Sequence, residues 1–136
     1  MGEDHFPSER ELFRACTEHW AETHPFPDPA RWGAIPDPTE RLRRALTDVY
    51  RWYEIVEHDL ALFERDAEVI PEQAAQSEAE LRALRDLLAA GWPPRPGVRA
   101  AIGHALEFES WRSLVRRQGL SRRAAVDAMV NLARTG

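Results

Sequence analysis

Apolar residues recur along this 136-residue chain at the three- to four-residue spacing of amphipathic helices, and no segment alternates as a strand does. The clearest helix start is Asp37-Pro38-Thr39-Glu40, in which an N-cap Asp precedes a Pro at the first helical position. The stripe that follows consists of Leu42, Ala45, Leu46, Val49, Trp52, Tyr53 and Val56. We therefore predict a helix from Asp37 to Val56 in an all-α fold of about six helices.

The region before this helix divides into two parts. Ser8 and Glu11 form a capping box, so the first helix begins at Ser8. Cys16, at helical spacing from Leu12 and Trp20, is interpreted as a small buried hydrophobe. The proline-rich segment 24–38 cannot form one regular helix. We expect it to lie against the body through its apolar residues Phe26, Trp32 and Ile35.

Beyond Val56 the pattern predicts four more helices. Glu57-His58-Asp59 is expected to break the chain before a short helix over 59–69, and Pro71 begins a helix over 71–90. A longer helix is predicted over 97–118, where Gly119 provides a left-handed C-terminal residue. Ser121 then caps the last helix.

The last two helices are apolar around more than one stripe, so each has two faces to bury. One face can pack on the body, and a second copy of the chain is the simplest partner for the other. The prediction is a homodimer in which these helices form a four-helix bundle. Its predicted interface consists of Val98, Ile102, Ala105, Leu114, Ala125, Met129 and Leu132.

Length and composition indicate one soluble domain. The net charge is −5, which gives no broad basic surface for a polyanion. The single cysteine, Cys16, cannot form an internal disulfide, which favours a cytoplasmic location. No apolar run is long enough for a bilayer span, so we expect no membrane partner.

Two stretches of the chain are similar to the tetracycline-repressor (TetR) family of transcriptional regulators. His5-Phe6-Pro7-Ser8 followed by Leu12-Phe13 resembles the junction between that family's DNA-binding head and its first body helix. The segment 100–126, with Trp111-Arg112-Ser113-Leu114 and Gly119-Leu120-Ser121, resembles the C-terminal helices of actinobacterial members. The resemblance spans essentially the whole chain.

The resemblance implies a bacterial regulator whose body dimerises through its last two helices and encloses a pocket for a small effector. Residues 1–7 would be the remnant of the head junction, and 8–136 the ligand-binding and dimerisation domain. His5 would be a vestigial DNA phosphate contact. Glu3 and Glu9 stand where the family has a Tyr and a basic residue, and carboxylates repel a phosphate backbone. We therefore expect DNA binding only if a helix-turn-helix head is present.

The candidate pocket residues are mainly aromatic. Trp52 and Tyr53 suit a flat apolar ligand but equally suit a packed core. His104, Phe108 and Trp111 share one face of the predicted 97–118 helix. There His104 either hydrogen-bonds an effector or is satisfied by a backbone carbonyl or at the dimer interface. Phe63 is included because the resemblance places its helix at the pocket wall. The predicted effector is a small apolar or aromatic molecule.

The sequence contains no motif for catalysis, a metal or a cofactor, and we expect the protein not to be an enzyme. The acidic group Glu54, Glu57, His58 and Asp59 lacks a paired histidine and is interpreted as a solvated helix end. One alternative function remains open, a head-less dimeric helical interaction module without an effector. A cavity beside Tyr53, Phe63 and His104 would favour the sensor, and a packed interior would favour the module.

Overall fold

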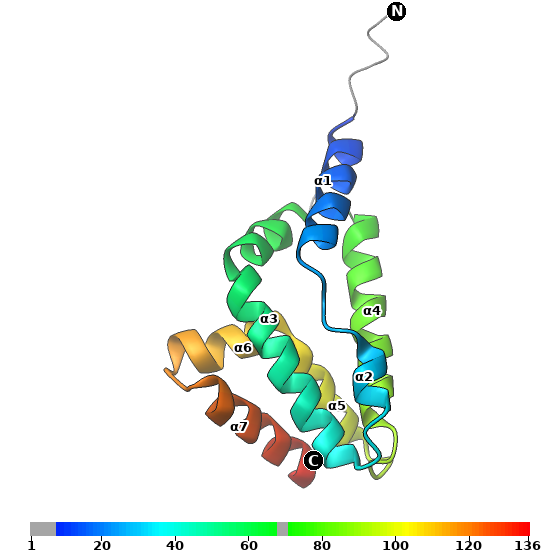
Figure 1. The fold of residues 1–136 in the computed structure, drawn as a ribbon, viewed down its shortest axis with the longest axis vertical. Coiled ribbons are helices and arrows are strands. Elements are labelled where there is room, and N and C mark those ends of the chain that lie inside the picture. The colour runs from blue at the N-terminus through cyan, green and yellow to red at the C-terminus, as the bar shows by residue number, and fades with distance from the viewer. Residues whose placement is uncertain (1–7, 68–70) are drawn as a thin grey trace, which may run out of the picture.

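The structure, a computed structural model, describes residues 8–67 and 71–136 of the chain. Within these ranges the regular secondary structure is entirely helical, with no strand, as the sequence predicts. The elements are α1 (Glu9–Thr23), α2 (Pro29–Gly33), α3 (Pro38–Ala67), α4 (Pro71–Ala89), α5 (Pro96–Leu106), α6 (Phe108–Trp111), a π-helical turn (Arg112–Arg117) and α7 (Arg122–Thr135). Figure 1 shows α1 at one end of the long axis and the C-terminus at the other.

Helix α1 begins with the predicted capping box. The Glu11 amide donates to Ser8 Oγ at 3.1 Å, and the Ser8 amide donates to Glu11 Oε2 at 3.3 Å. The predicted burial of Cys16 is wrong, because its side chain is exposed and Leu12 is 51% exposed. Trp20, near the C-terminal end of α1, packs against Trp52 and donates its Nε1–H to Asp59 at 2.8 Å. The contact with the body is thus made near the end of α1 that leads to α2.

The proline-rich segment is irregular apart from α2, and its aromatic residues lie against the body as predicted. Trp32 is fully buried and donates its Nε1–H to Asp48 Oδ2 at 2.9 Å. Phe26 packs edge-on against both Trp32 and Trp52. Burial of these rings fixes the segment to α3 without requiring regular helix.

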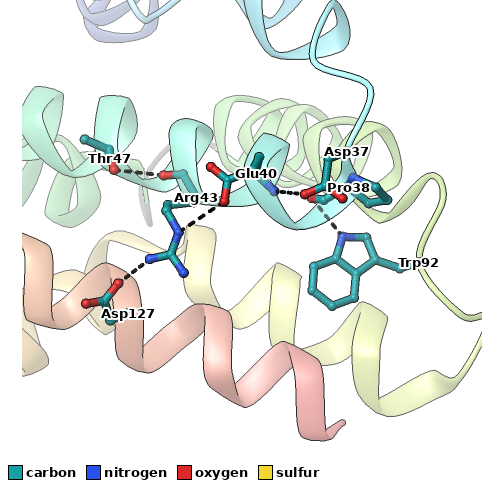
Figure 2. Close-up of polar contacts among 7 residues, drawn as sticks. All are labelled: Asp37, Pro38, Glu40, Arg43, Thr47, Trp92 and Asp127. Atoms are coloured by element: carbon teal, nitrogen blue, oxygen red, sulfur yellow. Dashed lines mark hydrogen bonds and ion pairs between the residues drawn. The ribbon is translucent and has the colours of Figure 1, made fainter.

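The N-terminal end of α3 has the cap that the sequence predicts. The Glu40 amide donates to Asp37 Oδ2 at 2.9 Å, and Trp92 donates its Nε1–H to the Pro38 carbonyl at 3.2 Å (Figure 2). Arg43, one turn further, forms an ion pair with Asp127 and so ties α3 to α7. The start of α3 is therefore held on one side by Trp92, which follows α4, and on the other by Asp127 of α7.

The predicted break at residues 57–59 is wrong, because α3 continues to Ala67. The three residues contain neither Pro nor Gly, and two of them have partners that a helix allows. Glu57 pairs with Arg116 at 2.8 Å, and Asp59 accepts from Trp20. Charged residues on an exposed face do not interrupt the backbone hydrogen bonds of a helix.

The core lies between α3, α5 and α7, and α4 covers α5 from the other side. Its largest fully buried side chains are Trp32, Trp111, Tyr50, Leu42, Leu46, Leu88, Ile102, Leu106, Val49, Val56, Val98 and Val130. Helix α4 matches its predicted range within a residue. No helix in the part of the chain that the structure describes is long and apolar enough to cross a membrane.

The single helix predicted over 97–118 is wrong, because the chain leaves the helical conformation at Glu107. Helix α5 ends at Leu106, and α6 with the π-helical turn follows in a new direction (Figure 1). The end of this segment is as predicted. Gly119 has a φ of 77°, and Ser121 caps α7 by accepting from the Ala124 amide at 3.1 Å.

Candidate ligand site at the break between α5 and α6

The break at Glu107 leaves backbone carbonyls at the end of α5 that a continuing helix would have bonded. Glu107 has an extended conformation, with φ −70° and ψ 138°. Tyr50 Oη donates to the Ala105 carbonyl at 2.6 Å, and Tyr53 Oη donates to the Leu106 carbonyl at 2.5 Å. Ser110 Oγ donates to the His104 carbonyl at 2.6 Å. Side chains from α3 and α6 therefore cap the end of α5.

Helix α3 positions both tyrosines, because residues three apart lie on the same face of a helix. Tyr50 is fully buried and Tyr53 is 5% exposed. Burial raises the pKa of the Tyr50 hydroxyl well above its ordinary value. Tyr50 therefore keeps its proton and remains a hydrogen-bond donor to the Ala105 carbonyl.

Three rings meet beside these hydrogen bonds, and we call Tyr53, Phe108 and Trp111 the aromatic centre. The Tyr53 and Phe108 rings are 5.3 Å apart and nearly perpendicular. The Tyr53 and Trp111 centroids are 5.9 Å apart, and Phe108 stacks on Trp111 at 5.6 Å. These separations lie in the favourable range for aromatic pairs. The aromatic centre joins the middle of α3 to the segment that follows the break.

Two donors at the aromatic centre are buried without a hydrogen-bond partner, Trp111 Nε1 and Arg112 Nε. Trp111 is fully buried. The other four of the five tryptophans donate their Nε1–H, to Asp59 from Trp20, Asp48 from Trp32, the His24 carbonyl from Trp52 and the Pro38 carbonyl from Trp92. A buried donor without an acceptor costs about 1–3 kcal/mol. The orphaned indole of Trp111 therefore requires an explanation.

Arginines flank the aromatic centre. Arg112 Cζ lies 5.1 Å from the Phe108 ring centroid, and Arg116 Cζ lies 5.2 Å from that of Trp111. Arg112 pairs with Glu109, Arg117 lies 3.7 Å from the same carboxylate, and Arg116 pairs with Glu57. The hydrogen bond that Arg116 donates to Glu57 raises the pKa of Arg116. Three guanidinium groups thus share two carboxylates.

The structure brings together four of the six predicted pocket residues. Trp52 adjoins the aromatic centre, with its ring centroid 5.8 Å from that of Tyr53. The side chain of Phe63 lies outside the described residues, as does His5. His104 is separate from the rings. Its side chain is 58% exposed, with Nδ1 3.6 Å from Glu107 Oε2.

Two open hollows lie elsewhere on the surface. One, of about 810 Å³, is lined by Arg43, Thr47, Ser121, Arg122, Arg123, Val126 and Asp127. The other, of about 400 Å³, includes His104 beside Arg82, Arg85 and Arg99. Neither hollow is lined by Tyr53, Phe108 or Trp111, and these three rings are packed against one another.

Most of the predicted dimer-interface residues belong to the core of the single chain. Val98, Ile102, Ala105 and Ala125 are fully buried, and Met129 is 8% exposed. Their burial between α3, α5 and α7 leaves them no surface for a partner in this conformation. Leu114 is half-buried and Leu132 is 43% exposed. These last two residues are the part of the predicted interface that a second copy can reach.

The sequence argument missed Tyr50, Ser110 and Arg112. Tyr50 was the easiest of the three to predict, because it lies three residues before Tyr53 on the same helix and its hydroxyl needs a partner when buried. Ser110 and Arg112 matter only because the helix breaks at Glu107. No sequence signal marks that break.

The acidic group on α3 is used for contacts between elements. Glu54 pairs with Arg122 at 3.3 Å, Glu57 with Arg116, and Asp59 with Trp20. Among the described residues no group of three or more His, Cys, Asp or Glu side chains is arranged to hold a metal ion.

Comparisons with protein-family models, curated proteins and solved structures find no match to this chain.

Proposed function

We propose that this chain is the effector-sensing and dimerising body of a TetR-like transcriptional regulator. The proposal rests on the sequence resemblance and on the arrangement of helices around the aromatic centre. It assigns no DNA contact to residues 8–136, since the resemblance places the DNA-reading head before the first body helix.

The observation that carries the sensing role is a chain of ring contacts from the aromatic centre to α1. Trp52 lies 5.8 Å from Tyr53 on one side and 5.8 Å from Trp20 of α1 on the other. Close-packed rings transmit displacements because an interior has little free volume. A shift at Phe108 or Trp111 is therefore passed through α3 to the helix that would carry the head.

The exposure of α1 suits this role. Leu12 toward its N-terminal end and Cys16 at its middle are exposed, while Trp20 near its other end packs on α3. A helix anchored near one end turns a small rotation at the anchor into a larger movement at the free end. Figure 1 shows α1 pointing away from α5, α6 and α7.

The dimerising role is assigned to the outer face of α7. Ala124, Ala128 and Leu132 follow one another at four-residue spacing on this helix, and Leu132 is 43% exposed. Small side chains flanking an exposed leucine allow two helices to approach closely. The proposed contact joins α7 of one copy to α7 of the other, with Leu114 at its border.

Light scattering coupled to gel filtration tests the dimer. We expect a dimer at micromolar concentration, and Leu132→Asp is expected to give a monomer. Ile55→Asp is the matched control, because Ile55 is 70% exposed and belongs to α3 rather than to the proposed α7 contact. A wild-type monomer, or equal dissociation by both variants, would contradict the proposed contact.

A second function is favoured by one specific observation. The rings of the aromatic centre are packed, and the Tyr53 hydroxyl is already bonded to the Leu106 carbonyl. Rings packed against one another in this way suit a head-less dimeric interaction module that takes no effector. Calorimetric titration with small aromatic molecules separates the two, since the module binds none of them.

A further inference from the structure

We propose that the aromatic centre binds a flat aromatic carboxylate, held by Trp111 Nε1 and Arg112 Nε. This rests on the proposed sensing function and names the chemical class of its effector. The inference begins with the two unpartnered donors at the break between α5 and α6.

The two unpartnered donors define which chemical groups the ligand must contain. An indole N–H and a guanidinium N–H can only donate, so both require an acceptor. The Trp111 ring is fully buried, and its Nε1 has no partner although the other four tryptophans have one. A purely apolar ligand would leave both donors unsatisfied. A carboxylate supplies two acceptor oxygens on one group.

The charge around the aromatic centre favours an anion. Arg112 and Arg117 share the carboxylate of Glu109, while Arg116 is matched by Glu57. The five side chains together carry a net charge of +1, from three arginines and two glutamates. A bound carboxylate would neutralise that excess.

The rings indicate the rest of the ligand. Phe108 and Trp111 are stacked with an interplanar angle of 23°, and Tyr53 meets Phe108 at 73°. A flat ring fits beside such a pair by offset stacking or by an edge contact. Inorganic phosphate or an aliphatic acid would satisfy the donors but gain nothing from the rings.

The backbone at the break between α5 and α6 provides a route by which the ligand enters the aromatic centre. Glu107, the N-cap residue of α6, makes no side-chain cap hydrogen bond, and the turn after α6 is π-helical, with Gln118 N donating to Ser113 O at 2.8 Å. Such π-helical turns are rare and recur at functional sites. The segment 107–117 is the element that moves to admit a ring between Tyr53 and Phe108. That movement is the shift passed to Trp52 and α1.

Isothermal titration calorimetry of the whole chain tests the proposal with three probes. Benzoate and 2-naphthoate are aromatic carboxylates of two sizes, and 2-naphthylmethanol is a neutral molecule shaped like the second. We expect saturable binding of at least one carboxylate at one per chain. The alcohol is expected to bind about tenfold more weakly than 2-naphthoate, or not at all.

Two variants remove the donors separately. Trp111→Phe keeps an aromatic ring without the N–H, and Arg112→Met keeps a long side chain without the guanidinium. Each is expected to weaken carboxylate binding about tenfold. Trp92→Phe and Arg99→Met are matched controls away from the aromatic centre, with an expected change below about twofold. Near-ultraviolet circular dichroism confirms that each variant has its tertiary packing.

Three results would overturn the proposal: no saturable binding of either carboxylate, equal binding of 2-naphthoate and its alcohol, or unchanged affinity in both donor variants. Light scattering on the same samples distinguishes this failure from failure of the proposed function. A dimer that binds no carboxylate refutes only the ligand class, whereas a monomer refutes the regulator body itself.

Discussion

Replacing Trp111 by phenylalanine should be far less harmful than the same change at Trp32, although both residues are fully buried. Each substitution removes one ring and leaves a similar cavity, which costs about 1–2 kcal/mol. The two differ in the hydrogen bond that is lost. Trp32 Nε1–H donates to the Asp48 carboxylate at 2.9 Å, whereas Trp111 Nε1–H has no acceptor.

The difference can be worked out from these contacts. A hydrogen bond to a charged group contributes about 1.5–3 kcal/mol, so Trp32→Phe should lower the free energy of unfolding by about 2.5–5 kcal/mol in total. Removing an orphaned buried donor recovers about 1–3 kcal/mol, which offsets the cavity. The net effect of Trp111→Phe on the free energy of unfolding therefore lies between a loss of about 1 kcal/mol and a gain of about 2 kcal/mol.

Urea denaturation followed by far-ultraviolet circular dichroism measures both changes. The two variants must be compared at equal protein concentration, because association stabilises the folded state. The expected gap is at least about 1.5 kcal/mol, or about 4 °C or more in Tm. If Trp111→Phe is as destabilising as Trp32→Phe to within about 0.5 kcal/mol, the Trp111 indole has a partner and the argument for an orphaned donor is lost.

Two further predictions concern Tyr50 and the positive-φ glycines. The pKa of Tyr50 is raised in the folded chain above its value in the unfolded chain. Above pH about 10 the unfolded chain therefore loses a proton that the folded chain keeps. The free energy of unfolding should then fall by up to about 1.4 kcal/mol per pH unit. The chain has no lysine, and in Tyr50→Phe this part of the alkaline slope in urea titrations should vanish. A slope unchanged by that variant would mean that another group causes it. Gly91→Ala should destabilise the protein more than Gly119→Ala, although both glycines have positive φ. A Cβ at Gly91 would lie 2.9 Å from Pro38 Cγ, whereas a Cβ at Gly119 would meet nothing within 4 Å. Melting temperatures test this order, with a cost of about 1 kcal/mol for Gly119→Ala and more for Gly91→Ala.

Local signals predicted helix ends well. The caps at Ser8, Asp37 and Ser121 and the left-handed Gly119 are all confirmed. Each of these features depends on residues within one turn of it, so the sequence contains what is needed to identify it.

Features that depend on distant residues were not predictable. The break at Glu107 is stabilised by the hydroxyls of Tyr50 and Tyr53, which lie 55 and 53 residues earlier than the carbonyls they bind. Helix α3 passes through Glu57 and Asp59 without interruption because their partners come from other elements. Periodicity also made Cys16 part of an apolar stripe, yet the residue is exposed.

The aromatic part of the candidate site was predictable, and its chemistry was not. Helical spacing placed Phe108 and Trp111 together, and the stripe of α3 included Tyr53. That the Trp111 indole lacks an acceptor follows only from the three-dimensional packing. His104 was grouped with the rings because the sequence suggested one continuous helix, and the break puts its exposed side chain elsewhere.

The central claim is that a ligand at the aromatic centre moves α1. Cys16 is the single cysteine, is exposed and lies on α1, so a spin label there reports the distance between the two copies in a dimer. Pulsed electron paramagnetic resonance should give one distance distribution without ligand and a displaced one with saturating 2-naphthoate. The Trp111→Phe variant should show the first distribution at the same ligand concentration. An unchanged distribution in a wild-type dimer that calorimetry shows to be saturated would contradict the claim.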